Sequence, residues 1–284
     1  IFPGKYIAAG PLASRWLQQQ FATDATLARS GAQVLGEPAA GYLSHPGYAA
    51  LPKAPYRYQE MLGVIWRENP SCYLQEGEQA VLLAALMETD NAGRPLIDAW
   101  INRSGLSADA WLEKLFEASV IPFYHLLCRY AVALIAHGQN VTLVMKDSIP
   151  QRILLKDFQG DMRLVDEDFP QAQSLPEQVK AVTARLSADY IIHDLQTGNF
   201  VTVLRFISRL TLQSGVSETR FYQILAGVLH RYMAVHPELA ERFATFDLFK
   251  PQIIRVILNP VKLTFSEHDG GSRMLPNYVT DLDN

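Results

Sequence analysis

A long helical pattern occupies the middle of the chain. After Ser107, apolar side chains recur every three or four residues along 108–136, for example at Trp111 and Leu115. This spacing places them on one face of a helix. Pro122 interrupts the pattern, and a proline inside a helix breaks or kinks it because proline lacks a backbone donor. We therefore predict a helix that begins after Ser107 and breaks near Pro122.

Shorter apolar segments outside this helix have the pattern of strands. Residues 141–145 and 152–158, joined by a polar turn, predict an antiparallel hairpin, and 161–165 predicts a third strand. Residues 61–69 and 79–88 are apolar runs between turn signals, a pattern typical of buried strands. A short helix is also compatible with 79–88.

Local signals predict the other elements. Residues 11–31 have the pattern of one or two short helices ending at Gly31, and 36–60, rich in Gly, Pro and Tyr, predict a structured loop. A capping box at 174–177 and an N-cap at Ser217 mark helix starts nearer the C-terminus. The helices predicted there span 176–195, 199–213 and 217–235, and a further ordered segment covers 251–265.

This order of elements predicts an α+β fold. Helices predominate, and the strands pair as antiparallel hairpins, because strands and helices do not alternate as in a parallel βαβ arrangement. We divide the chain into a mixed α/β segment over 1–105 and a region over 106–284 that contains the central hairpin and the C-terminal helices.

The composition narrows the class of protein. With 284 residues, 49% hydrophobic and 19% charged, the chain is long enough to bury a large core. A net charge of −4 argues against binding along a nucleic-acid backbone. No apolar run approaches the roughly 20 residues that span a bilayer, and two cysteines, Cys72 and Cys128, make no disulfide framework. We expect a cytoplasmic protein that binds neither nucleic acid nor membrane.

Two polar clusters flank the predicted hairpin. His137, Gln139 and Asn140 precede its first strand, and Asp157 and Gln159 lie at the end of its second. A hairpin returns the chain to the edge where it started, so these side chains can converge. Mg²⁺ takes oxygen ligands from few side chains together with phosphates, so Asn140 and Asp157 are the candidate metal ligands.

The hairpin also carries candidate phosphate donors, His137 and Lys156. Alternation along a strand predicts that Lys156 and Asp157 point to opposite faces. The alternative to a ligand site is structural: His137 and Asn140 would cap the preceding helix, and Asp157 and Gln159 would form a turn.

The two clusters follow the order of the protein-kinase signature, a catalytic loop ending in Asn and then an Asp-Phe-Gly segment. The kinase base is an Asp two residues after the His, and Gln139 stands in its place. A carboxylate nucleophile needs no such base, because it is already ionised at neutral pH. The pattern therefore favours activation of a carboxylate at the α-phosphorus of ATP. A kinase-like small-molecule phosphotransferase and a non-enzymatic scaffold are the alternatives.

Several segments together resemble the NRPS-independent siderophore synthetases, the IucA/IucC family. They are GKYIAAGPLASRWL (4–17), GYLSHPGYAALPKAPYRYQEMLGVIWREN (41–69), AHGQN (136–140), PQRILLKDFQGDMR (150–163), LSADYIIHDLQTGNFVTVLRFIS (186–208) and QIIRVILNPVKLTF (252–265). The resemblance implies the C-terminal, fingers-and-palm part of a cupped-hand fold. In that fold 1–105 would contribute loops to the phosphate and substrate sites, and 106–284 would form the palm.

The resemblance also implies an activity, that of an ATP-dependent acid–amine ligase. With ATP and Mg²⁺, such an enzyme adenylates a carboxylate of citrate or citryl monoamide and releases pyrophosphate. It then joins the acyl group to the amine of a hydroxamate, N6-acetyl-N6-hydroxylysine, and releases AMP. The expected partners are these small molecules and further copies of the chain in a homo-oligomer.

Family positions transfer to this chain residue by residue. His137, Gln139 and Asn140 match the family's His-Gly-Gln-Asn motif at the ATP site, and the position of Asp157 matches an acid near the phosphates and metal. The family's upstream Ser/Thr…Arg phosphate motif has no counterpart, so we expect the chain to begin just beyond it. Ile135 departs from the family, many of whose members have an acid there. The implied catalytic residues are His137, Asn140 and Lys5, and the implied ATP-binding residues are His137, Gln139, Asn140, Asp157, Gln159 and Arg15.

Other charged residues are candidates for the substrate site. Arg57, Arg67 and Lys262 are the candidates for binding carboxylates, since an arginine can hold a carboxylate through two hydrogen bonds. Ion pairs of the arginines with Glu60 or Glu68, and a surface position for Lys262, are the alternatives.

The remaining polar residues have simpler interpretations. Glu37 and His45, in the Gly/Pro-rich loop, either line the site or pack within the loop. The charges of 161–168 have the pattern of a solvated rim. The histidines within helical patterns, His125, His193 and His230, have no second ligand one turn away and are predicted to be structural.

Overall fold

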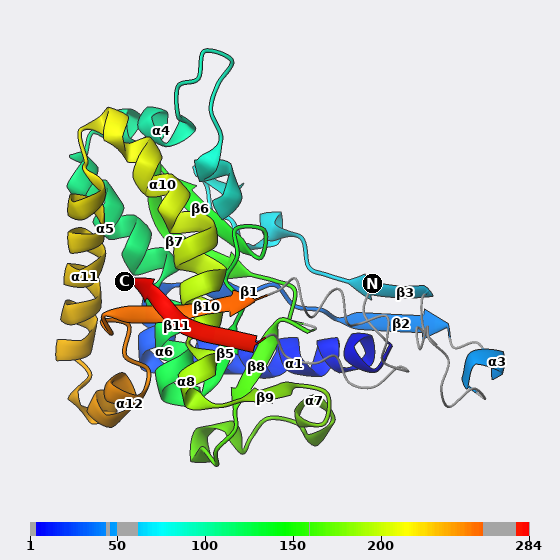
Figure 1. Ribbon diagram of the computed structural model, residues 1–284. Helices are drawn as coiled ribbons and strands as arrows, with labels where there is room; N and C mark the ends of the chain where they lie inside the picture. Colours follow the sequence, from blue (N-terminus) through cyan, green and yellow to red (C-terminus); the bar gives the residue numbers. More distant parts are fainter. Residues whose placement is uncertain (1–3, 44–45, 50–61, 159, 258–276, 284) are drawn as a thin grey trace.

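The computed structural model describes residues 4–43, 46–49, 62–158, 160–257 and 277–283, which form the predicted α+β fold (Figure 1). The α-helices are α1 (Gly4–Thr23), α2 (Ala25–Ser30), α3 (Pro46–Ala49), α4 (Leu96–Ser104), α5 (Ala108–Ser119), α6 (Ile121–Tyr130), α7 (Glu177–Lys180), α8 (Ala188–Ile191), α9 (His193–Leu195), α10 (Arg205–Leu210), α11 (Glu218–Ala234) and α12 (Ala240–Thr245). The strands are β1 (Gln33–Val34), β2 (Ala39–Leu43), β3 (Leu62–Trp66), β4 (Glu78–Leu82), β5 (Val132–Leu134), β6 (Val141–Lys146), β7 (Ile149–Leu155), β8 (Met162–Val165), β9 (Ala184–Leu186), β10 (Gln252–Ile257) and β11 (Asn277–Asp283).

The helix boundaries predicted from capping residues, glycine and proline are confirmed in three segments. The segment 11–31 lies in α1 and α2, and Gly31 ends α2 in the left-handed conformation with φ 67°. Ser107 caps α5 by accepting a hydrogen bond from the amide of Ala110, and Pro122 lies in the first turn of α6. Ser217 caps α11 in the same way. These three signals act within one turn, and at these positions no distant contact replaces them.

The helix predicted over 108–136 ends earlier than its pattern suggested. Ala131 adopts a left-handed conformation, φ 55°, directly after α6, and the chain continues as β5. This strand pairs with β8, so hydrogen bonding to a distant segment replaces the last turns of the helix. An apolar run that is buried on all sides has no periodicity that distinguishes a helix from a strand.

The predicted central hairpin is confirmed. Strands β6 and β7 pair antiparallel in a four-stranded sheet of order β1-β7-β6-β4. Asp147 and Ser148 form the turn, both at positive φ, which matches the twist of a two-residue hairpin. The predicted third strand exists as β8 but belongs to a second sheet, of order β5-β8-β9.

The other two strand predictions are correct only in part. Residues 79–88 divide into the edge strand β4 and the 3₁₀ helix η2 (Leu83–Met87). Residues 62–66 form β3, which is not buried: it pairs only with β2 within the described residues, and Trp66 is 54% exposed. Strand β2 occupies part of the segment predicted as loop, and in Figure 1 the β2–β3 ribbon extends away from the body.

The C-terminal part is more broken than predicted. The helix expected over 176–195 is wrong, because α7, β9, α8 and α9 divide this range. The capping box is also wrong: Ser174 Oγ accepts a hydrogen bond from the indole of Trp16 at 2.9 Å, and α7 has no side-chain cap. The helix expected over 199–213 is divided between the π-helix η4 (Gln196–Leu204), α10 and a 3₁₀ turn. The segment 251–265 contains β10, and its residues from 258 onward lie outside the described residues.

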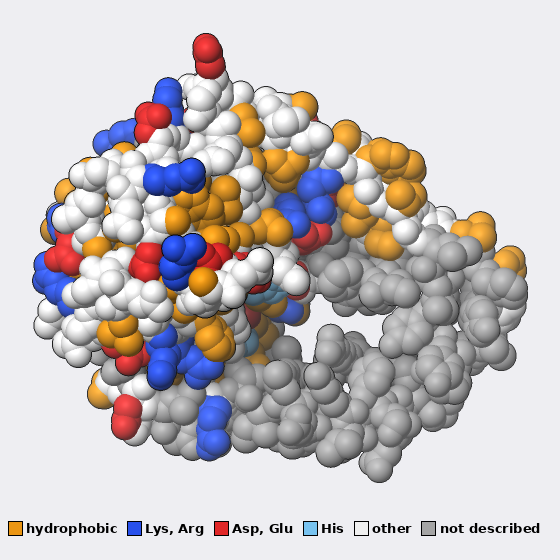
Figure 2. All heavy atoms as spheres, turned by 90° about the horizontal axis from the view of Figure 1, so that it is seen from above, with side chains coloured by type: hydrophobic (Ala, Val, Ile, Leu, Met, Phe, Trp, Pro, Cys, Tyr) orange, Lys and Arg blue, Asp and Glu red, His pale blue; other side chains and the backbone are white. Residues whose placement is uncertain are grey.

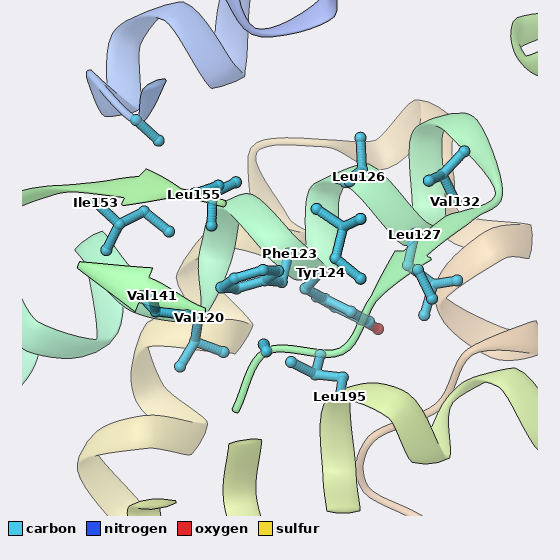
Figure 3. Packing of buried hydrophobic residues seen from close by; sticks show 14 of the residues in the cluster. Val120, Phe123, Tyr124, Leu126, Leu127, Val132, Val141, Ile153, Leu155 and Leu195 are labelled. Carbon is cyan, nitrogen blue, oxygen red and sulfur yellow. The ribbon is translucent and has the colours of Figure 1, made fainter. Parts of the chain in front are cut away.

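A hydrophobic cluster holds these elements together. It contains residues from Ala9 to Leu248, so both segments of the predicted division contribute to it. Helix α6 lies at its centre, with Phe123, Tyr124 and Leu127 packed between the sheet and the C-terminal helices (Figure 3). Within the described residues, no helix has the length and hydropathy needed to cross a membrane.

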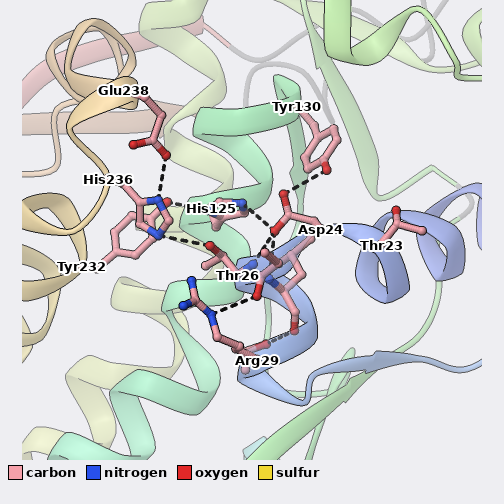
Figure 4. Close-up of polar contacts among 12 residues, drawn as sticks. Thr23, Asp24, Thr26, Arg29, His125, Tyr130, Tyr232, His236 and Glu238 are labelled. Carbon is pink, nitrogen blue, oxygen red and sulfur yellow. Dashed lines mark hydrogen bonds and ion pairs between the residues drawn. The ribbon is translucent and has the colours of Figure 1, made fainter.

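A buried polar network joins the N-terminal helices to this core (Figure 4). Asp24 caps α2, and its Oδ1 lies 3.1 Å from His125 Nε2 of α6. His125 Nδ1 lies 2.7 Å from the Tyr232 hydroxyl of α11, and the ring of His236 lies beside that of His125 at 5.4 Å. The prediction that His125 is structural is consistent with these contacts.

Candidate active site

The two polar clusters lie at a junction between the sheets. Residues 135–140 lead from β5, in the three-stranded sheet, to β6, in the four-stranded sheet, and 156–161 lead back from β7 to β8. The two connections contact each other through their backbones. Ile135 N donates to Asp161 O at 3.0 Å, and Lys156 N donates to Asn140 O at 3.3 Å. The hairpin therefore brings both clusters to one place, as its length predicted.

Gly138 determines how the first connection packs. Its carbonyl accepts a hydrogen bond from Ala84 N, in η2, at 3.0 Å. A Cβ at position 138 would lie only 3.0 Å from the Cα and Cβ of Ala84. Glycine is required here because the backbones approach too closely for a side chain.

Asp161 is the point on which the first cluster converges. Asn140 Nδ2 donates to Asp161 Oδ2 at 2.9 Å, and His137 Nε2 lies 3.9 Å from the same oxygen. Burial raises the pKa of Asp161, the Asn140 hydrogen bond and the His137 charge lower it, and the nearby Asp157 charge raises it; the net change is upward. The interpretation of 161–168 as a solvated rim is wrong for Asp161, which is half-buried, and holds for the exposed 166–168.

Asp157 anchors the second cluster. It follows the end of β7 and adopts a left-handed conformation, φ 64°, which Asp tolerates better than most residues. Arg67 Nη2 donates to its Oδ1 at 2.5 Å, and Lys156 Nζ lies 3.8 Å from its Oδ2. The prediction that Lys156 and Asp157 point to opposite faces is wrong, because β7 has already ended and strand alternation no longer applies.

A small pocket opens between the clusters. Asn140, Lys156, Asp157 and Asp161 line it together with apolar side chains, among them Phe123. Figure 2 shows acidic, basic and histidine side chains close together on a hollowed part of the molecular surface. Its charged groups are two carboxylates and one ammonium, so the pocket presents both signs of charge beside an apolar wall.

The other predicted site residues are distributed as follows. Gln139 is exposed beside the pocket residues, and Arg15 is exposed on α1, with no ion pair among the residues that the structure describes. Lys5 lies in α1, but its side chain is outside the described part. Arg57, Gln159, Lys262 and His45 lie outside the described residues. The structure thus places His137, Asn140, Asp157 and Arg67 around one junction.

Three further polar residues near this junction had no clear signal in the sequence. Asn199, fully buried in η4, donates from Nδ2 to Ala136 O at 3.0 Å and so supports the first connection. Asp194 is also buried, and its Oδ2 has no hydrogen-bond partner in the described part of the chain. Asp161 looked like one of several surface acids. A polar residue within an apolar helical run, as at Asn199, is the one hint that was available.

The residues present are compatible with Mg²⁺ in its usual mode, in which one or two carboxylates act together with ligand phosphates. Within the described residues, no three His, Cys, Asp or Glu side chains form a ready metal site. Asp157 and Asp161 are close enough for the charge of one to raise the pKa of the other, and a cation would relieve that repulsion. The expectation that Asn140 and Asp157 are metal ligands stays a prediction.

The α+β fold thus carries a charged pocket at the junction of its four-stranded and three-stranded sheets. The family comparisons name the class. The IucA/IucC family matches residues 1–88, and the family described as ferric iron reductase FhuF-like transporter matches residues 109–272. The chain belongs to the IucA/IucC family of siderophore synthetases, as its motifs predicted.

Individual relatives agree with this assignment. The chain is 70% identical to the aerobactin synthase of Escherichia coli over 99% of its own length and 49% of that protein's. It superimposes on the aerobactin synthetase IucC of a hypervirulent Klebsiella pneumoniae with a TM-score of 0.85 and 67% identity, covering 93% of this chain and 46% of that one. The ATP-bound aerobactin synthetase IucA of the same pathotype shares the fold, with a TM-score of 0.68 and 17% identity over 89% and 45% of the two chains. The chain spans about half the length of the curated relatives that it matches.

Proposed function

We propose that the protein containing this chain is an ATP-dependent acid–amine ligase of siderophore biosynthesis. It adenylates a carboxylate of citrate or citryl monoamide and joins it to the amine of N6-acetyl-N6-hydroxylysine. The observation that carries the proposal is the convergence of His137, Asn140 and Asp161 with Asp157 and Arg67 across the hairpin. The high identity to a protein named aerobactin synthase supports this choice of substrates.

The first chemical step needs no general base, because the attacking carboxylate is already ionised at neutral pH. A carboxylate oxygen of the substrate attacks the α-phosphorus of ATP, and the bond to the leaving pyrophosphate breaks. In this proposal His137 and Lys156 stabilise negative charge on the phosphates during this step. Gln139 contacts the nucleotide or the substrate. Asp157 and Asn140 would hold Mg²⁺, which supplies charge neutralisation when bound.

In the second step the amine nitrogen attacks the acyl carbon, and the bond from that carbon to the phosphate oxygen of AMP breaks. AMP leaves with the electron pair of this bond, and the nitrogen releases a proton to the solvent. Negative charge again develops on phosphate oxygens as AMP leaves, so the same cations can stabilise both steps. We propose Arg67 as a residue that binds a carboxylate of the substrate, with Arg57 and Lys262 as further candidates. Lys5 as a catalytic residue, and Arg15 and Gln159 at the nucleotide, complete the proposed site.

The wider setting is also a proposal. Residues 1–105 would contribute phosphate and substrate loops, and 106–284 would contribute the nucleotide hairpin. The protein would act in the cytoplasm as a homo-oligomer on small molecules.

The test is release of pyrophosphate from ATP by the intact protein, with citrate and citryl monoamide compared and the hydroxamate amine present or absent. We expect pyrophosphate and AMP that depend on both carboxylate and amine. Release of ADP would instead favour the phosphotransferase. Absence of pyrophosphate release with every carboxylate would contradict the ligase, and unchanged activity of His137→Ala would favour the non-enzymatic scaffold.

A further inference from the structure

Arg67 bridges two carboxylates from different parts of the fold. Its Nη2 donates to Glu37 Oε1 at 3.0 Å and to Asp157 Oδ1 at 2.5 Å. Glu37 lies between β1 and β2, whereas Asp157 lies beyond β7 at the sheet junction. The arginine thereby connects the N-terminal loops to the nucleotide hairpin.

The two carboxylates differ in their surroundings. The side chain of Glu37 is fully buried, and that of Asp157 is 38% exposed. Burial raises the pKa of Glu37, the bond and charge of Arg67 lower it, and the charge of Asp157 raises it, with a net upward change. The backbone of Glu37 is held as well, since its N–H donates to Ser14 Oγ at 3.1 Å. A buried carboxylate without a cation is costly, so Arg67 is bound firmly on the Glu37 side.

The bond between Arg67 and Asp157 is the one of the two that can be exchanged for water or another cation. An exposed carboxylate can be solvated when its partner leaves, and it can take a second cation. Lys156 Nζ, 3.8 Å from Asp157 Oδ2, is already such a cation.

Arg67 also retains donors that neither carboxylate uses. A guanidinium has five N–H donors, and both bonds above leave from Nη2. Its Nε is buried and has no hydrogen-bond partner among the residues that the structure describes. Because both hydrogens of Nη2 are taken, the unused donors on Nη1 and Nε can each bind a single oxygen of an anion.

We propose that Glu37 is a positioning residue: it fixes Arg67 so that the unused donors of the guanidinium receive an oxyanion, the carboxylate or phosphate of a substrate. The proposed function determines which anion we expect, a carboxylate or a phosphate of a substrate. The expectation that Arg67 binds an anion does not depend on that function. In this proposal Glu37 acts on the anion through Arg67.

The test compares two buried glutamates that each pair with an arginine. Glu37→Gln removes the charge at the site and keeps the shape. The matched control is Glu78→Gln, because Glu78 forms a two-bonded pair with Arg152 at 2.5 and 2.8 Å, near the turn of the hairpin and away from the junction. ATP and citrate are titrated separately into the full-length protein by calorimetry, which distinguishes a phosphate from a carboxylate as the anion.

We expect Glu37→Gln to weaken binding of ATP or citrate about 10-fold, as for loss of a charge-assisted bond, and Glu78→Gln to change it less than about 2-fold. Both variants should lose thermal stability, so stability alone does not discriminate between them. Equal binding of both anions by wild type and Glu37→Gln would overturn the proposal.

Glu37→Asp covers the case in which Glu37→Gln does not fold. It keeps the charge on a shorter side chain, so its affinity should fall measurably below that of the wild type; an unchanged affinity counts against the proposal. Pyrophosphate release by the wild type is measured in parallel. If binding depends on Glu37 and no pyrophosphate forms, the ligase proposal fails and the positioning role stands. If pyrophosphate forms and binding does not depend on Glu37, the ligase proposal stands and the positioning role fails.

Discussion

Asn140 Nδ2 donates to Asp161 Oδ2 at 2.9 Å, although a complete β-hairpin separates the two residues along the chain. Asp161 thereby orients the amide of Asn140 and attracts His137, whose Nε2 is 3.9 Å from the same oxygen. The polar residues of the two connections form one unit only because Asp161 closes it.

Asp161→Ala should impair catalysis more than folding. Without the carboxylate, Asn140 and His137 lose their common partner, and a displacement of about 1 Å at a reacting centre costs about 100-fold in rate. We expect kcat/KM for pyrophosphate release to fall by that order. Asp166→Ala, an exposed acid five residues further along, is the control and should be neutral. Equal effects of the two variants would contradict the role of Asp161.

The pH dependence of activity follows from the same residue. Because burial raises the pKa of Asp161, its carboxylate takes up a proton at a higher pH than an exposed Asp does. Protonation removes the charge that faces His137, so kcat/KM should fall as the pH decreases through this raised pKa. In Asp161→Asn this decrease at acid pH should be absent, and kcat/KM should be lower than in the wild type at pH values above this pKa. A decrease at the same pH in both proteins would assign it to another group.

Gly138→Ala should damage the first connection. The added Cβ would lie 3.0 Å from the backbone of Ala84, which cannot move like a flexible side chain. We expect a loss of about 1–3 kcal/mol in the free energy of unfolding, typical of overpacking, together with weaker ATP binding. Gly227→Ala is the matched control, because that glycine lies within α11 with only the end of Arg231 nearby, at 3.7 Å. Alanine there should be neutral or stabilise the helix by up to about 1 kcal/mol.

Asp24 should make stability depend on acid pH. Burial raises its pKa, but bonds from His125 and the backbone amides of Leu27 and Thr26, with the His125 charge, lower it more, so the net value is well below 3.8. The stabilisation is therefore complete above about pH 4 and is lost as the pH falls below it. Urea unfolding from pH 6 to pH 2 should show a weaker pH dependence for Asp24→Asn, which is also less stable at pH 6. Glu238→Gln, at an exposed partner of His236, should leave both properties nearly unchanged.

The two cysteines should differ in reactivity. Cys72 is exposed, whereas Cys128 is buried in α6, where burial raises the pKa of its thiol. Since the thiolate is the reactive form, iodoacetamide should label Cys72 in the folded protein and Cys128 only after denaturation. Peptide mass spectrometry measures both positions in one sample. Rapid labelling of Cys128 in native buffer would mean that α6 opens readily.

Much of the site was predictable because its signals are local. Two strands and a tight turn follow each other directly between 141 and 155, so their pattern alone implied that the flanking polar residues meet. Ser107, Ser217 and Gly31 likewise mark helix ends through contacts within one turn. The sequence resemblance then identified the family.

Long-range pairs were decided by the tertiary structure alone. Ser174 looked like a helix cap, but its hydroxyl bonds to Trp16, 158 residues away. The strand β5 exists because β8 lies beside it, and Asp161 is a site residue because the same pairing buries it next to Asn140. By itself the sequence determined those helix ends, such as Ser107, Ser217 and Gly31, whose hydrogen bonds lie within one turn. Which distant groups satisfy the remaining buried donors and acceptors depends on the packing of the whole chain, which no local pattern records.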